Sequence, residues 1–354
     1  MNVRPIVLCS MLACLSLIAC TKEPSASPAT AAASSDAANV SSNAAKSGSN
    51  EAKAAVLPDA QIKDAQVKQV SAISDAPSGN QLPNIDGNHV MQYVKEIVAI
   101  GSRPVGSPGH AKLEQYIHNK LKGDQVEDDT FTAQTPVGEK RINNIIAKFP
   151  GKKDGIIVVA GHYDTNYPLP KAYVGANDGG SSTALLLAIA DQLRGKPNDG
   201  YSIWLLWTDG EEAFVTWSAS DSVYGTKHLA QKWQQDGTAK KIKAFLLVDM
   251  IGDADLDIQQ EANSTPWLSE LVYKAASNLG YQSHFYQIKT PIEDDHLPML
   301  KVGIPSVDII DLDYGYNNAY HHTPDDTLDK LSPKSLAISG DVVMETIRLI
   351  NAHY

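Results

Sequence analysis

Histidine and carboxylate side chains recur at five places in the chain where they could do chemistry. In chain order the candidates are His162, Asp178, Glu212, Asp249 and His322. Carboxylate and imidazole donors without sulfur suit zinc in a catalytic site, although other divalent ions accept the same donors. A lone His or Asp at such a place is usually satisfied by backbone amides, but five at corresponding positions favour a metal site.

The adjacent residues Glu211 and Glu212 are predicted to take different roles. Neighbouring residues of an extended segment point in opposite directions, so both cannot easily bind the same ion. One carboxylate could bind the metal while its neighbour faces the substrate and exchanges protons, provided that burial and nearby acids raise its pKa. The alternative is a solvated acidic turn.

The composition and missing motifs exclude other chemistries. The net charge of −11 and a pI near 5.3 argue against binding to nucleic acid. Cys9, Cys14 and Cys20 are the only cysteines, so the rest of the chain has no disulfide, thiolate ligand or cysteine nucleophile. The chain also lacks His-Glu-x-x-His, Gly-x-Ser-x-Gly, phosphate-loop and Gly-x-Gly-x-x-Gly motifs.

The candidate residues follow apolar runs that predict strands. These runs are 156–160 before His162, 201–207 before Glu211-Glu212, and 243–249, which ends in Asp249. A run that is apolar on both faces predicts a strand inside a sheet that is covered on both sides. Ligands of open α/β sheets bind at the carboxyl ends of the strands, so the three clusters are expected on one rim.

Helical patterns alternate with these strands. We expect two opening helices, over 90–98 and from Pro108, then helices over 185–193 and 333–350, with helical segments between the later strands. Further strands are expected around Phe131, over 142–149 and over 304–310. This alternation predicts an α/β domain with a largely parallel sheet between helical layers.

The N-terminal part predicts export and lipid anchoring. The segment Leu17-Ile-Ala-Cys20 follows a short apolar run and resembles a bacterial lipobox, with an ordinary signal peptide as the alternative. Cleavage would leave Cys20 to be lipidated, and the following Thr21 favours the outer membrane over the inner one. We therefore expect a lipid-anchored protein of the bacterial cell envelope, on the outer membrane and facing the periplasm.

The chain is accordingly expected to have three parts. Residues 1–19 are a lipoprotein signal peptide, 20–81 are the lipidated Cys and a disordered Ala/Ser-rich linker, and 82–354 are one zinc-dependent catalytic domain.

Five motifs together resemble those of the co-catalytic zinc aminopeptidases and their relatives, the animal-type glutaminyl-peptide cyclotransferases. They are Gly161-His-Tyr-Asp-Thr165, Gly175-Ala-Asn-Asp178, Asp209-Gly-Glu-Glu212, Val248-Asp-Met-Ile-Gly252 and His322-Thr-Pro-Asp-Asp-Thr327. The segments 209–217, 221–230 and 293–300 resemble the cyclotransferase branch more closely.

This resemblance implies a single three-layer α/β/α domain around a mixed, largely parallel sheet. It implies one zinc held by Asp178, Glu212 and His322, and conversion of N-terminal glutamine of peptides or proteins to pyroglutamate. In this interpretation Glu211 is the proton shuttle, and Asp249 and Asp294 are hydrogen-bonded to it.

The substrate pocket implied by the resemblance includes Trp217. The cyclotransferases have Gln where Glu293 stands and Trp where His321 stands, so these two expected substrate-binding positions depart from the family pattern.

The main alternative is an aminopeptidase with one or two zinc ions. In the two-zinc form Asp178 bridges, His162 and Asp249 complete the second site, and Glu211 deprotonates a metal-bound water. The choice depends on whether His162 and Asp249 touch metal or protein groups.

Overall fold

The structure is a computed structural model that describes residues 84–167 and 172–353. The predicted signal peptide, Cys20, the linker and the start of the catalytic domain at residue 82 lie outside the described residues. Within the described ranges, no helix is both long and apolar enough to cross a membrane.

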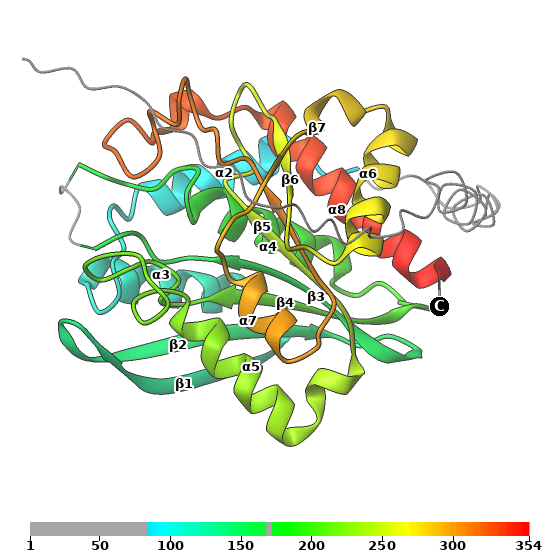
Figure 1. Cartoon of the computed structure of the whole chain (residues 1–354), viewed down its shortest axis with the longest axis horizontal. Helices are drawn as coiled ribbons and strands as arrows, with labels where there is room; N and C mark the ends of the chain where they lie inside the picture. The colour runs from blue at the N-terminus through cyan, green and yellow to red at the C-terminus, as the bar shows by residue number, and fades with distance from the viewer. Residues whose placement is uncertain (1–83, 168–171, 354) are drawn as a thin grey trace, which may run out of the picture. The chain divides into compact units, whose positions relative to one another are not determined.

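The described residues form one eight-stranded mixed sheet (Figure 1). In chain order its strands are β1 (Gln125–Thr135), β2 (Gly138–Phe149), β3 (Lys153–His162), β4 (Tyr201–Thr208), β5 (Ile242–Asp249), β6 (Ile258–Glu261), β7 (Phe285–Thr290) and β8 (Ser306–Ile310). Their spatial order is β1-β2-β4-β3-β5-β8-β6-β7. The four central strands are parallel, and antiparallel pairs join β1 to β2, β2 to β4 and β8 to β6.

Helices cover both faces of the sheet (Figure 1). They are α2 (Gly87–Val98), α3 (Pro108–Lys120), α4 (Gly180–Leu193), α5 (Tyr224–Asp236), α6 (Pro266–Leu279), α7 (His296–Lys301) and α8 (Pro333–His353). On one face α2 packs against α4 and α8, and α6 packs against α8. On the other face α5 packs against α7. The predicted three-layer α/β/α fold is confirmed.

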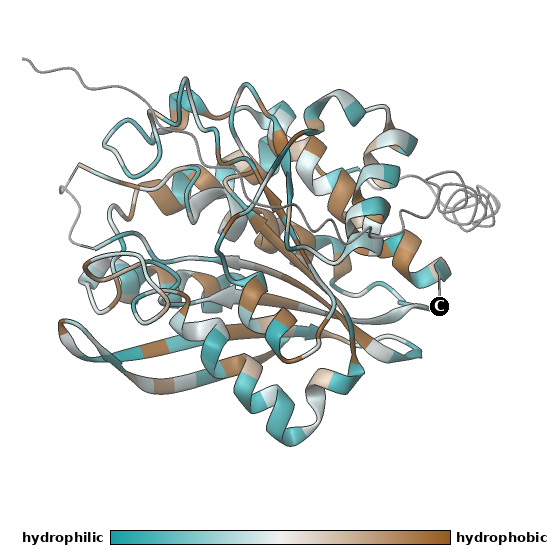
Figure 2. Ribbon diagram, in the orientation of Figure 1, coloured by the Kyte–Doolittle hydropathy of each residue, from teal (hydrophilic) through white to brown (hydrophobic). Residues whose placement is uncertain are grey.

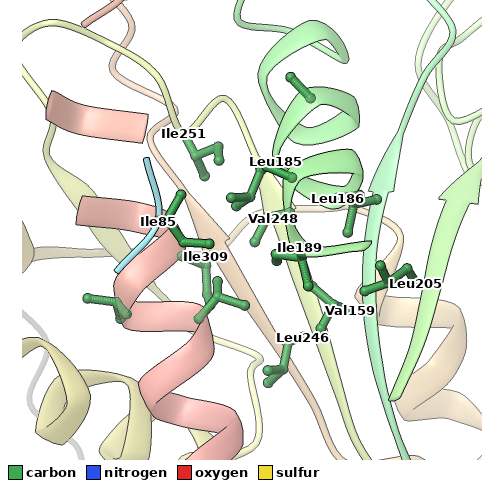
Figure 3. Packing of buried hydrophobic residues seen from close by; sticks show 14 of the residues in the cluster. Ile85, Val159, Leu185, Leu186, Ile189, Leu205, Leu246, Val248, Ile251 and Ile309 are labelled. Carbon is green, nitrogen blue, oxygen red and sulfur yellow. The ribbon is translucent and has the colours of Figure 1, made fainter. Parts of the chain in front are cut away.

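The side-chain alternation of β3 supplies two separate cores. Ile157 and Val159 belong to the cluster that includes α4, whereas Ile156 and Val158 belong to the cluster with Trp233 of α5. All four are buried, and hydropathy colouring shows the central strands as hydrophobic (Figure 2). Figure 3 shows the first core, where Val159, Leu246 and Ile309 face α4 and α8. A strand apolar on both faces thus lies inside the sheet, as predicted.

Most predicted elements are found. The opening helices begin at caps, because the Asp86 carboxylate accepts the amide of Asn88 and the Ser107 hydroxyl accepts that of His110. The sequence predicted only helical segments between β5 and β8, whereas the structure also has β6 and β7 there. These two strands are short, β7 is an edge strand with mostly exposed residues, and neither shows an apolar run.

Candidate active site

One pocket of about 520 Å³ collects the predicted side chains at the carboxyl ends of the central strands. Nine of the predicted site residues line it: Asp178, Glu211, Glu212, Trp217, Asp249, Glu293, Asp294, His321 and His322. His162 is buried behind this wall, in contact with Asp178 and Asp249. The strand-end argument therefore predicts the location of the site.

The three side chains predicted to hold zinc meet at the imidazole of His322. Its Nε2 atom lies 3.3 Å from Oδ2 of Asp178 and 3.1 Å from Oε1 of Glu212. These residues are 144 and 110 positions from His322 in the chain, so only the fold brings them together. Two carboxylates and one imidazole are a donor set that suits a catalytic zinc ion and leaves a coordination position open.

Asp178 is held by the loop that leads into α4. The Tyr173 hydroxyl donates to its Oδ2 atom over 2.5 Å, and the Asp326 carboxylate accepts the backbone amides of Asn177 and Asp178. Gly179 then takes φ +69°, a left-handed conformation that lets the chain turn into the helix. Tyr173 and Asp326 were not predicted, because nothing in their local sequence shows which residues they will contact.

Glu211 and Glu212 follow β4 in a turn, not in the extended segment that was expected. Gly210 has φ +63°, and the Asp164 carboxylate accepts the amides of Glu211 and Glu212 at 3.2 and 3.3 Å. Asn166 also donates to Oε2 of Glu212 over 2.8 Å. Both glutamates line the pocket, and the chain turns at Gly210 before them. That only one of them binds the metal stays a prediction.

The two glutamates nevertheless have different neighbours. Glu212 contacts His322, whereas Oε2 of Glu211 lies 3.9 Å from Nδ1 of His162, a buried atom without a hydrogen-bond partner in the described structure. Glu212 thus contacts another predicted zinc ligand, whereas Glu211 lies beside His162.

A second group of possible ligands shares Asp178. Nε2 of His162 lies 3.0 Å from Oδ1 of Asp178 and 3.2 Å from Oδ1 of Asp249. Donor atoms of these three residues lie within 4.8 Å of one another, and so do those of Asp178, His321 and His322. The two oxygens of Asp178 therefore face different imidazoles, Oδ1 that of His162 and Oδ2 that of His322.

The charges around His322 fit a bound cation. Burial disfavours a charged His322, but Glu212 and Asp178 outweigh this and raise its pKa to about 11. Burial and the nearby Asp178 carboxylate raise the pKa of Glu212 to about 7. Crowded carboxylates of this kind are stabilised by a positive charge, which a protonated His322 or a metal ion can supply.

Glu211, Asp249 and Asp294 are the pocket residues predicted to take part in proton transfer. Burial raises the pKa of Glu211 well above its usual range, and Asp294 and Glu212 add to this effect although His162 opposes it. Burial and the Asp249 carboxylate likewise raise the pKa of Asp294. A buried carboxyl group with a raised pKa holds a proton more readily than an exposed one, as a proton shuttle requires.

The hydrogen bonds expected from Glu211 to Asp249 and Asp294 require a shared proton, and they stay a prediction. Asp249 contacts His162 and accepts the Met250 amide at 2.8 Å, while Asp294 accepts the Asp295 amide at 2.5 Å. Both acids still line the same pocket as Glu211. Each carboxylate also accepts an amide of the next residue in the chain, and Asp249 contacts His162 on the neighbouring strand.

The rest of the pocket wall is mixed in polarity. Trp217 is half-buried and Glu293 is exposed. The ring of His321 stacks beside that of His322, with centroids 3.9 Å apart, and its Nε2 atom lies 3.8 Å from Asp178. The sequence argument missed the apolar part of the wall, which comprises Met250, Pro291, Ile292, Ile310 and Leu312.

Comparison with known proteins relates this fold to the zinc-dependent exopeptidases. The structure is similar to that of a Zn-dependent exopeptidase from Parabacteroides distasonis, with a TM-score of 0.66 and 25 % identity over 75 % of this chain and 99 % of that chain. Residues 144–347, more than half of the chain, match the model of peptidase family M28. The chain belongs to peptidase family M28.

Within this comparison the chain is similar to glutaminyl cyclases. The crystal structure of a glutaminyl cyclase from an Acidobacteriales bacterium matches it with a TM-score of 0.77 and 52 % sequence identity. That match covers 79 % of this chain and 100 % of the bacterial chain. The present chain is also 34 % identical over 244 residues to the glutaminyl-peptide cyclotransferase of Boiga irregularis. That match covers 58 % of this chain and spans 66 % of the length of the snake protein.

Proposed function

We propose that the protein is a zinc-dependent glutaminyl-peptide cyclotransferase, which converts N-terminal glutamine of peptides or proteins to pyroglutamate and releases ammonia. The observation that carries this proposal is the single pocket in which Asp178, Glu212 and His322 meet beside the buried Glu211. The 52 % identity to a bacterial glutaminyl cyclase over the whole of that chain supports it.

The reaction needs few groups, because the nucleophile and the leaving group belong to the same residue of the substrate. The α-amine attacks the side-chain amide carbon, a new C–N bond forms, and the bond to the amide nitrogen breaks. Zinc held by Asp178, Glu212 and His322 would polarise the amide carbonyl. Holding the two reacting atoms together in one pocket supplies the proximity that a ring closure requires.

Glu211 is the group that balances the protons. The attacking amine loses a proton and the departing nitrogen gains one, so a single carboxyl group can take up the first and deliver the second. The raised pKa of Glu211 suits this exchange, because burial makes its carboxyl group a stronger proton acceptor than an exposed glutamate. The neighbouring carboxyl groups of Asp294 and Glu212 contribute to the raised pKa of Glu211.

A zinc aminopeptidase is the second candidate function. The group formed by His162, Asp178 and Asp249 favours it, because its donor atoms already lie within reach of a second ion. In that reaction a water molecule attacks the peptide bond, and Glu211 accepts its proton.

An assay on two substrates tests the proposal. We expect the purified, zinc-loaded protein to form a pyroglutamyl product and ammonia from glutaminyl-β-naphthylamide, and to leave leucyl-p-nitroanilide intact. Removing zinc with a chelator should abolish turnover, and adding it back should restore turnover. Release of free leucine with two zinc ions per chain would establish the aminopeptidase instead, and zinc-loaded protein inert on both substrates would contradict both candidates.

We also propose that lipidation at Cys20 anchors the protein to the outer membrane, on the side that faces the periplasm. Support comes from the lipobox-like segment that ends at Cys20 and from Thr21 after it. The Ala/Ser-rich residues up to 81 would then serve as a tether between the membrane and the catalytic domain.

A further inference from the structure

His321 is the first of two adjacent histidines at the active-site pocket. Only the second, His322, was predicted to bind zinc, whereas His321 stands where the cyclotransferases have Trp. The indole nitrogen of Trp is a hydrogen-bond donor only, but an imidazole nitrogen can bind zinc. This chain therefore has an additional side chain of the zinc-binding kind, directly beside one of the predicted ligands.

The two imidazoles face the same carboxylate oxygen. Nε2 of His321 lies 3.8 Å from Oδ2 of Asp178, and Nε2 of His322 lies 3.3 Å from that atom. One donor atom from each of these three residues lies within 4.8 Å of the other two. A separation of 3.8 Å is too long for a hydrogen bond. It suits two ligands of one tetrahedral zinc ion, because donors about 2 Å from the ion lie roughly 3–4 Å apart.

The other ring nitrogen of His321 has a neighbour that can support metal binding. Nδ1 of His321 lies 3.1 Å from Nδ2 of the Asn318 side chain. Oδ1 of the same amide group is buried and has no hydrogen-bond partner in the described structure. A half-turn of the amide brings Oδ1 to the ring, where it accepts the Nδ1 proton and leaves Nε2 unprotonated. Metal-bound histidines usually donate their second ring nitrogen to an oxygen in this way.

We propose that His321 is a fourth protein ligand of the zinc ion, together with Asp178, Glu212 and His322. This inference rests on the zinc-dependent function proposed above. Three protein ligands leave one position of a catalytic zinc ion open, and His321 would occupy that position before substrate binds. The carbonyl oxygen of the substrate then has to displace the His321 imidazole or bind beside it as a fifth donor, a number that zinc accepts.

The number of histidine ligands and the zinc affinity test this inference without an activity assay. We expect X-ray absorption at the zinc edge to show two histidine ligands in the zinc-loaded protein and one in His321→Gln. Competition with a chelator should show that His321→Gln binds zinc at least about tenfold more weakly, because losing even a residue that only supports a ligand costs about 10- to 100-fold. If His321→Gln fails to fold, His321→Trp, which introduces the cyclotransferase residue, should give the same two results.

Two further substitutions separate this inference from the proposed function. His322→Gln should lose zinc, because His322 is a ligand with or without His321. His118→Gln, a change on α3 in a side chain that is 36 % exposed, should alter neither zinc affinity nor the number of histidine ligands. Equal numbers of histidine ligands in wild type and His321→Gln would overturn the inference and leave the proposed function intact. A wild-type protein that binds no zinc would contradict both.

Discussion

Glu211 and Glu212 show how two identical side chains acquire different tasks. Glu212 receives a hydrogen bond from Asn166 and contacts His322, so its oxygens are directed to the predicted zinc ligands. Glu211 has neither contact and lies beside the imidazole of His162. The difference arises from the turn at Gly210 and from Asp164, which fixes both backbone amides.

Replacing Glu211 by Gln tests its predicted role as proton shuttle. The amide has almost the same size but cannot exchange a proton, so we expect kcat to fall by roughly 10²- to 10⁴-fold. Zinc content should stay at the wild-type value, because Glu211 is not among the predicted ligands. Turnover and zinc stoichiometry, measured on the same preparation, check both statements.

Two further variants make this result specific. Glu212→Gln should lose zinc as well as activity, because Glu212 is a predicted ligand. Glu270→Gln, the same change at an exposed position of α6, should alter neither quantity. A Glu211→Gln protein with wild-type turnover would rule out the shuttle.

The sequence could predict which residues form the site but not which residues hold them. Asp178, Glu212 and His322 stand out because they follow apolar runs or lie in family-like motifs. The residues that hold Asp178 in place could not be predicted. The contact from Asp326 to Asp178 spans 148 positions, and no local feature marks Tyr173. Such partners become visible only when the fold has placed the loops side by side.

At the scale of elements, the apolar pattern determines how much can be predicted. The strands β3, β4 and β5 were predicted because each is buried on both faces and reads as a continuous apolar run. The short strand β6 was missed because its buried residues are mostly polar, such as Gln259 and Glu261. The edge strand β7 was missed because it is short and half of its residues are exposed, so it shows no apolar run. The predicted fold class is nevertheless confirmed, because β6 and β7 extend the sheet at one end and leave its parallel centre unchanged.

Helix α4 links the core to the site, so its packing is the element to test. Ile189 is fully buried in the core shown in Figure 3, and α4 begins two residues after Asp178. We expect Ile189→Ala to lower the free energy of unfolding by about 2–5 kcal/mol, through lost apolar contacts and the cavity left behind. Urea unfolding followed by circular dichroism measures this change.

The same substitution on the surface provides the comparison. Ile288 of β7 is 53 % exposed, and its replacement by Ala should change the free energy of unfolding by no more than about 0.5 kcal/mol. Equal losses in the two variants would show that α4 does not stabilise the core as described.

At the scale of the whole molecule, the proposed membrane location depends on the N-terminal segment. The membrane association proposed above is assigned to lipidation of Cys20. Lipidation supplies several acyl chains, which hold a protein far more firmly than one chain does.

Replacing Cys20 by Ser should therefore release the protein from the membrane fraction. We expect the wild-type protein in the membrane pellet and most of the Cys20→Ser protein in the soluble fraction, as measured by immunoblot after cell fractionation. Cys14→Ser, a change within the predicted signal peptide, should leave the distribution as in wild type. Unchanged partitioning of Cys20→Ser would exclude the anchor.

The shared carboxylate of Asp178 has a consequence for redesign of the enzyme. Because its two oxygens face opposite imidazoles, any substitution at this position damages both halves of the pocket together. His162 and Asp249 lie on the side of Oδ1 only, so their replacement would alter the possible second metal position and leave the predicted ligands of the first in place. Attempts to convert ring closure into peptide cleavage, or the reverse, should therefore begin at His162 and Asp249 and leave Asp178 in place.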